Sequence, residues 1–133
     1  SWDIPDTASR TLGAPLMGFE LMDQNGEMVN LYDFAGQGVP VLIDVSATWC
    51  PPCNDLASWL SGEGDPAGFN NYWPNVPDMI ANGEAYWLTV LGQNDEGQSP
   101  TLDNLETWYN DYPDPHVPIF GGDEAATFAN TYK

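Results

Sequence analysis

Val41-Leu42-Ile43-Asp44-Val45-Ser46-Ala47-Thr48-Trp49-Cys50-Pro51-Pro52-Cys53 is the run of residues from which the architecture of this chain can be predicted. The residues from Val39 to Val45 are apolar except for Pro40 and Asp44, which is typical of a central strand covered on both faces. The two prolines after the first cysteine fit the first turn of a helix, where their missing N–H groups leave no hydrogen bond unmade. Apolar residues at positions 56, 59 and 60 continue at helical spacing. We therefore predict a strand, a Cys-Pro-Pro-Cys turn and a helix in direct succession.

Cys50 and Cys53 are the only cysteines among the 133 residues. At a helix N-terminus, partial positive charge stabilises the thiolate of the first cysteine. The second cysteine lies one turn further in, where it can attack a mixed disulfide and release the substrate. A purely structural disulfide is less favoured, because closing so short a loop removes little chain entropy. The spacing therefore indicates a reversible two-electron redox pair.

Metal binding is the other chemistry that two cysteines could support. A zinc site needs four ligands, whereas Cys50, Cys53 and His116 are the plausible soft or borderline donors of the chain. Copper(I) held by two thiolates stays open as an alternative. His116 lies between prolines and is interpreted as an ordinary loop or strand-edge residue. We expect no metal and no cofactor.

The charge balance is extreme, with Arg10 and Lys133 as the only cations against 20 acidic residues and a net charge of −18. Such a charge repels phosphate backbones and anionic lipids, so nucleic-acid binding is disfavoured. The acids are dispersed, which favours a solubility role over an acidic face for a basic partner. No apolar run approaches the roughly 20 residues of a transmembrane helix, so we expect no direct membrane insertion of this segment. Residues 1–5 do not resemble a signal peptide, which fits a cytoplasmic protein or a mature piece without its targeting segment.

The rest of the chain alternates between strand-like and helix-like segments. We expect a β-hairpin around the turn at residues 23–26, where a calcium loop is disfavoured because the glycine comes too early. The other expected elements are a helical turn at 31–36, a short helix at 77–81, a strand at 85–91, a helix starting at Ser99-Pro100, a strand at 117–120 and a helix at 123–132. This order predicts an α/β fold with a largely parallel sheet.

Two segments lack a regular period. Residues 1–12 are expected to form an irregular lead-in to one domain at 13–133. Residues 61–77 are rich in Gly, Asn, Asp and Pro with interleaved aromatics, which indicates an irregular insertion folded against the domain. A substrate-facing lid is the alternative role of this insertion.

Residues 13–133 resemble the thioredoxin superfamily, and specifically its TlpA-like (AhpC/TSA-related) branch of extracytoplasmic thiol-disulfide oxidoreductases. The segments that carry the resemblance are the hairpin at 13–26, the L-x-D-x-x-G turn at 31–36, the strand and active-site motif at 41–53, and the strand and helix at 117–132. The resemblance implies a thioredoxin-like fold, in which helices flank a central, mostly parallel or mixed sheet that carries an N-terminal β-hairpin.

The resemblance also implies roles for individual residues. Cys50 is the expected nucleophile and Cys53 the resolving thiol. Trp49, Pro51 and Pro52 are expected to shape the substrate-contact surface and to stiffen the loop.

Asp44 lies six positions before Cys50, where thioredoxins carry a buried aspartate. Burial would raise the pKa of this carboxyl, which could then accept the Cys53 proton through a water molecule. The alternative is an aspartate at a strand end that faces solvent or caps the following turn.

Thioredoxin-like proteins place a cis-proline opposite their cysteines. Val117-Pro118 is a candidate by its position after Cys50, yet its surroundings better match the strand-helix segment that precedes that proline. On this alignment, the family's last β-hairpin and C-terminal helix are missing from this chain, which is then expected to be either a fragment or an unusual minimal version.

We predict that the protein is an extracytoplasmic thiol-disulfide oxidoreductase, and the resemblance favours a reductant over an oxidant. It would act as a monomer on protein disulfide or dithiol substrates and receive electrons from an unidentified donor. The alternative is a redox-inert thioredoxin-fold binding module that uses an acidic, aromatic-rich surface. A peroxidase of the peroxiredoxin type is disfavoured, because such enzymes use a lone peroxidatic cysteine.

Overall fold

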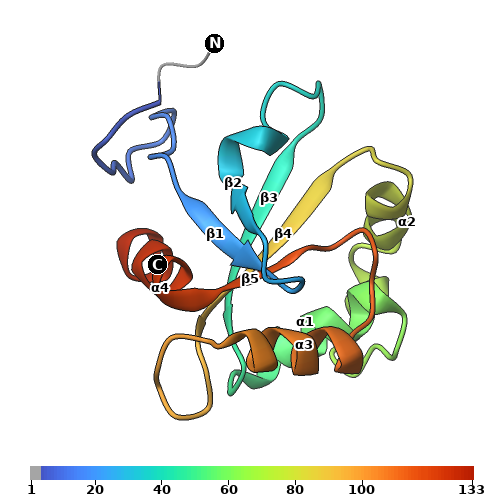
Figure 1. Cartoon of the computed structure of the whole chain (residues 1–133). Helices are drawn as coiled ribbons and strands as arrows, with labels where there is room; N and C mark the ends of the chain where they lie inside the picture. The colour runs from blue at the N-terminus through green and yellow to red at the C-terminus, as the bar shows by residue number, and fades with distance from the viewer. Residues whose placement is uncertain (1–3) are drawn as a thin grey trace.

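The computed structural model describes residues 4–133 (Figure 1). Its elements are β1 (Glu20–Asp23), β2 (Met28–Asn30), the 3-10 helix η1 (Leu31–Phe34), β3 (Val41–Ala47), α1 (Pro51–Ser61), the 3-10 helix η2 (Phe69–Asn71), α2 (Val76–Ala81), β4 (Tyr86–Gln93), α3 (Leu102–Asp111), β5 (Ile119–Gly121) and α4 (Gly122–Tyr132). The strands pair in the order β2-β1-β5-β4-β3. β3, β4 and β5 are parallel, and β1 is antiparallel to both of its neighbours. The predicted α/β fold with a mixed sheet is confirmed.

The β1–β2 hairpin forms where the turn residues predicted it. The Asp23 carboxylate accepts the N–H groups of Asn25 and Glu27, both at 2.9 Å. Gly26 has a φ of +78°, a left-handed conformation that glycine adopts without strain. The Asp23 carboxylate therefore stabilises the turn. This agrees with the prediction of a hairpin turn in preference to a calcium loop.

Helices cover both faces of the sheet, because β4 sends alternate side chains to opposite sides. Leu88 and Val90 pack with α4 and the hairpin, whereas Leu91 packs with α1 and α3. In Figure 1, α1 and α3 lie together below the sheet, and α4 lies to the left of them. Two apolar cores result, one on each face of the sheet. None of the helices between residues 4 and 133 is long and apolar enough to cross a bilayer.

The prediction that β3 is a central strand covered on both sides was wrong for the described sheet. β3 lies at the edge of the sheet and pairs only with β4. Leu42 is 42% exposed and Val45 is 36% exposed. The apolar run correctly indicated a strand, but it carries no information about which neighbour pairs with each edge.

The prediction that α3 starts at Ser99-Pro100 was also wrong. The N-cap is Thr101, whose hydroxyl accepts the Asn104 N–H at 3.2 Å, while the Asn104 side chain accepts the Thr101 N–H at 2.9 Å. This reciprocal pair forms a capping box. Pro100 is buried just before the helix, and its carbonyl accepts the Gly122 N–H at 2.8 Å.

The segment at 61–77 lies at the C-terminal end of α1. Its Phe69 ring packs on Trp59 with a centroid distance of 5.2 Å, and the Trp59 indole donates to Asn70 Oδ1 at 2.7 Å. Tyr72 remains 73% exposed. Since the cysteines lie at the other end of α1, about 16 Å away by helical rise, this position does not support a lid over them.

Irregular structure also precedes the hairpin. Residues 4–12 of the predicted lead-in contain no helix or strand. Residues 1–3 of that lead-in lie outside the described residues.

Candidate active site

The cysteines lie where β3 ends and α1 begins, at the carboxyl edge of the parallel strands. Cys50 is the N-cap residue of α1, with an extended backbone at φ −85° and ψ 111°. Pro51 and Pro52 occupy the first two helical positions, as their missing N–H groups predicted. The first free amide of the helix is therefore that of Cys53, and it donates to the Cys50 sulfur at 3.3 Å.

The two cysteines are joined in a disulfide in this structure, with their Cα atoms 5.2 Å apart. Cys50 and Cys53 are both half-buried, whereas Pro51 and Pro52 are exposed. The pair also lines a hollow of about 300 Å³ whose walls come from β3, β4 and α4, including Gln93 and Ala129. A substrate chain can therefore reach the pair from solvent.

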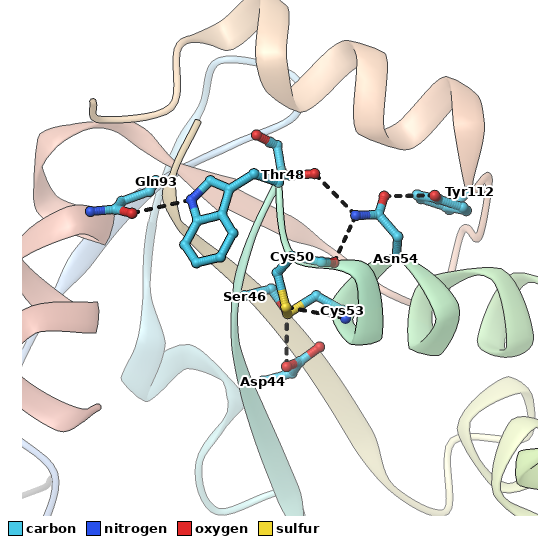
Figure 2. The surroundings of a disulfide bond; sticks show 9 residues. Asp44, Ser46, Thr48, Cys50, Cys53, Asn54, Gln93 and Tyr112 are labelled. Carbon is cyan, nitrogen blue, oxygen red and sulfur yellow. Dashed lines mark hydrogen bonds between the residues drawn. A yellow bond between two sulfur atoms is a disulfide. The ribbon is translucent and has the colours of Figure 1, made fainter. Parts of the chain in front are cut away.

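The loop before Cys50 is anchored to β4 and to the segment after it. The Thr48 hydroxyl donates to Asp95 Oδ1 at 2.7 Å, and the Thr48 N–H donates to the Gln93 carbonyl at 3.1 Å. The Trp49 indole donates to Gln93 Oε1 at 3.2 Å and is 56% exposed (Figure 2). Trp49 is thus held in one orientation beside the cysteines while one face stays open.

A second set of hydrogen bonds holds the same loop from the side of α1. Asn54 donates from its amide to the carbonyls of Thr48 and Cys50, at 3.0 and 2.9 Å. The Tyr112 hydroxyl donates to Asn54 Oδ1 at 2.7 Å (Figure 2). Tyr112 could not be predicted from the sequence, because it lies 58 positions from Asn54 and no pattern links the two.

Asp44 points from β3 toward the side of the sheet that α1 and α3 cover. It lines a cavity of about 10 Å³ with Ala57, Leu60 and Trp108, about the room of one water molecule. The cysteines line the outer hollow and not this cavity, so the structure places the three predicted catalytic residues near one helix but not in one pocket.

Burial raises the pKa of the Asp44 carboxyl, as predicted. The Ser46 hydroxyl donates to Asp44 Oδ1 at 3.0 Å and opposes this rise. The indole N–H of Trp87 also attracts the carboxylate, although it is buried without the geometry of a hydrogen bond, so we assign it the smaller effect. Asp44 lies in the middle of β3, which excludes the alternative of an aspartate at a strand end.

The other residues considered from sequence lie away from the cysteines. His116 is exposed in the turn before β5, and its N–H donates to Asp114 Oδ1 at 2.9 Å. Because β3 and β5 are both parallel to β4, this turn and Val117-Pro118 lie at the edge of the sheet opposite to Cys50. Val117-Pro118 is therefore not the proline that faces the cysteines. Within residues 4–133, no group of three or more His, Cys, Asp or Glu side chains is arranged to hold a metal ion.

Known proteins share this arrangement of elements. The thiol:disulfide interchange protein DsbE of Escherichia coli K12 is 33% identical over 95 residues, which cover 68% of this chain and 48% of DsbE. DsbE of Shigella flexneri matches with the same identity and coverage. A solution structure of a candidate protein disulfide isomerase from Bacteroides thetaiotaomicron superposes with a TM-score of 0.56 at 15% identity, covering 86% of this chain and 60% of that one. The chain is a member of the thioredoxin superfamily.

Membership of the thioredoxin superfamily confirms the predicted resemblance and the predicted fold. No protein-family model matches the chain. The chain spans about half the length of the curated relatives it matches. The activity and partners of those longer proteins are therefore proposals for this thioredoxin-superfamily chain.

Proposed function

We propose that the chain is a thiol-disulfide oxidoreductase that exchanges disulfides with protein substrates through Cys50 and Cys53. The observation that carries the proposal is the position of Cys50 as the N-cap of α1, with its sulfur accepting the Cys53 N–H at 3.3 Å. A thiolate at this position is stabilised by the helix N-terminus and by that hydrogen bond. The similarity to DsbE supports the same chemistry.

In the proposed reductive direction, the reaction begins from the dithiol. The Cys50 thiolate attacks a substrate disulfide, forms a mixed disulfide and expels one substrate sulfur as a thiolate, which takes up a proton. Cys53 then loses its proton and attacks the Cys50 sulfur. The second substrate sulfur leaves, and the Cys50–Cys53 disulfide remains. Two electrons have passed from the protein to the substrate, and its two thiolates are neutralised by one proton equivalent to that released from Cys53 and one from solvent. A donor dithiol must then restore the pair.

Asp44 is proposed to accept the Cys53 proton, through one water molecule, during the second step. Its raised pKa brings the carboxyl closer to the acidity that a general base needs near neutral pH. The cavity of about one water molecule beside Asp44 is not lined by the cysteines, so the proposed bridging water lies outside it. The raised pKa of Asp44 supports a proton-transfer role over a structural one.

Substrate contact is proposed to involve the surface that surrounds the cysteines. Trp49, Pro51 and Pro52 are all exposed there, and Trp49 is fixed by its hydrogen bond to Gln93. We further propose that the protein acts outside the cytoplasm as a monomer and as a reductant, with an electron donor that is not identified. The resemblance to the TlpA-like branch supports this location and direction.

The test is the reduction of a model protein disulfide driven by dithiothreitol. We expect wild-type protein to accelerate it and Cys50→Ser to abolish the acceleration. Cys53→Ser should retain the first attack and accumulate a mixed disulfide with the substrate, which non-reducing electrophoresis detects. Activity that survives Cys50→Ser would remove the enzymatic proposal and favour a redox-inert binding module. The direction is tested by equilibrating the pair with glutathione, since a reductant forms its disulfide in more reducing mixtures.

A further inference from the structure

Asn54 joins the redox loop to the helix that follows it. Its amide nitrogen donates to two carbonyls, Thr48 O at 3.0 Å and Cys50 O at 2.9 Å, which lie on either side of Trp49. The Asn54 backbone N–H also donates to the Cys50 carbonyl at 3.1 Å. One side chain in the first turn of α1 therefore fixes the backbone on both sides of the residue that precedes the reactive cysteine.

Tyr112 decides which way the Asn54 amide faces. An amide side chain presents an acceptor at one end and two donors at the other. Because the Tyr112 hydroxyl donates to Asn54 Oδ1 at 2.7 Å, the Asn54 nitrogen is directed to the loop carbonyls. Burial, Asp111 and Asp55 raise the pKa of Tyr112, so its hydroxyl remains a donor throughout the neutral pH range.

Tyr112 is itself held at the end of α3. Its ring packs edge-on against Trp108 with a centroid distance of 5.0 Å, and its N–H donates to the Trp108 carbonyl at 2.9 Å. Trp108 is buried in the core that α1 and α3 share. The position of α3 is thereby transmitted through Tyr112 and Asn54 to the backbone of Cys50 (Figure 2).

We propose that Asn54 and Tyr112 are a positioning pair that holds the Cys50 sulfur at the N-cap of α1 and so keeps it reactive. The sulfur accepts the Cys53 N–H only while the loop keeps its present path. A loop released from Asn54 lets the sulfur move away from this N–H and from the helix N-terminus, where its thiolate is stabilised. Neither residue contacts the sulfur through its side chain, so both act through the backbone. The inference rests on the proposed function for its role in catalysis.

The experiment measures the acidity of the Cys50 thiol directly, without a substrate. The rate of iodoacetamide alkylation is followed against pH in a Cys53→Ser background, where Cys50 is the only thiol. Tyr112→Phe removes a single hydroxyl and keeps the ring packing. We expect the midpoint of its profile to rise by up to about one pH unit, with alkylation near pH 7 slowed about two- to tenfold, as for the loss of one hydrogen bond. Tyr109→Phe, on the same helix but outside these hydrogen bonds, should leave the midpoint unchanged.

Two further variants test whether the residues act as one unit. Asn54→Ala should raise the midpoint at least as far as Tyr112→Phe, and adding Tyr112→Phe to it should bring no further rise. Fully additive shifts would overturn the pair. A merely structural role would lower the thermal midpoint of unfolding and leave the alkylation profile in place, which also overturns the proposal. If Asn54→Ala does not fold, the comparison of Tyr112→Phe with Tyr109→Phe decides alone.

The alkylation result is independent of turnover. A shifted midpoint in Tyr112→Phe supports the positioning pair even where the wild-type protein fails to reduce a protein disulfide, in which case only the proposed function is lost. An unshifted midpoint in an active enzyme removes the positioning pair and leaves the proposed function in place.

Discussion

Replacing Asp44 with asparagine should stabilise the folded protein increasingly as the pH rises. The carboxyl has a raised pKa in the folded state because it is buried, so its charged form is disfavoured there relative to the unfolded chain. Below the ordinary pKa of an aspartate, both states are protonated and the burial has no electrostatic cost. As the pH rises through the folded pKa, the unfolded state holds fewer protons than the folded state, and the wild-type protein loses stability.

The expected size follows from linkage and from the contacts of the carboxylate. Each tenfold decrease in the acid dissociation constant of the Asp44 carboxyl on folding lowers the free energy of unfolding by about 1.4 kcal/mol at pH values above the folded pKa. Asparagine can still accept the Ser46 hydroxyl through its Oδ1, an interaction now made at 3.0 Å. Any cost of burying its amide N–H groups is the same at every pH. The pH-dependent part of the difference therefore reports the buried charge alone.

The assay is urea unfolding of wild type and Asp44→Asn, both with the disulfide intact, at several values between about pH 4 and pH 8. The other acidic residues are common to both proteins, so their contribution cancels in the difference. Glu106→Gln, at an exposed position on α3, serves as the control for the loss of one negative charge. A wild-type minus Asp44→Asn difference that stays constant over this pH range would refute a buried, destabilising charge at Asp44.

Two further changes have defined outcomes. In stopped-flow measurements, Asp44→Asn should slow the resolving attack of Cys53 more than the first attack of Cys50, and equal slowing of both steps would remove the proton-transfer role. Gly92→Ala should lower the free energy of unfolding by about 1–3 kcal/mol in urea, because its added Cβ would lie 2.5 Å from that of Ala129. The same change at exposed Gly64, where the nearest atom is 3.5 Å away, should cost far less.

Local signals in the sequence were sufficient to predict most elements of the fold. The turn at Asp23 and Gly26 and the prolines after Cys50 each act within a few residues, so their chemistry is visible in a short window. The start of α3 was misplaced because Ser99-Pro100 has the composition of a helix start. Thr101 is the N-cap instead, because Asn104 lies three residues later and completes the reciprocal cap.

Pairing between distant segments could not be predicted in the same way. The apolar run of β3 indicated a strand but not its position at the edge of the described sheet. The bond between Asn54 and Tyr112 joins two polar residues that belong to no periodic pattern. Such contacts follow from the packing of α3 beside α1, which depends on the whole core and not on the residues that finally meet.

The redox loop is thus specified by more than its Cys-Pro-Pro-Cys motif. The motif places one sulfur at a helix N-cap and brings the second within bonding distance. The path of the preceding loop depends on Gln93 and Asp95 on one side and on Asn54 with Tyr112 on the other. Since parallel strands end at one edge of the sheet, the segments after β3 and β4 meet at this loop. A change in the segment after β4 or in α3 can therefore alter the reactivity of Cys50 without touching the motif.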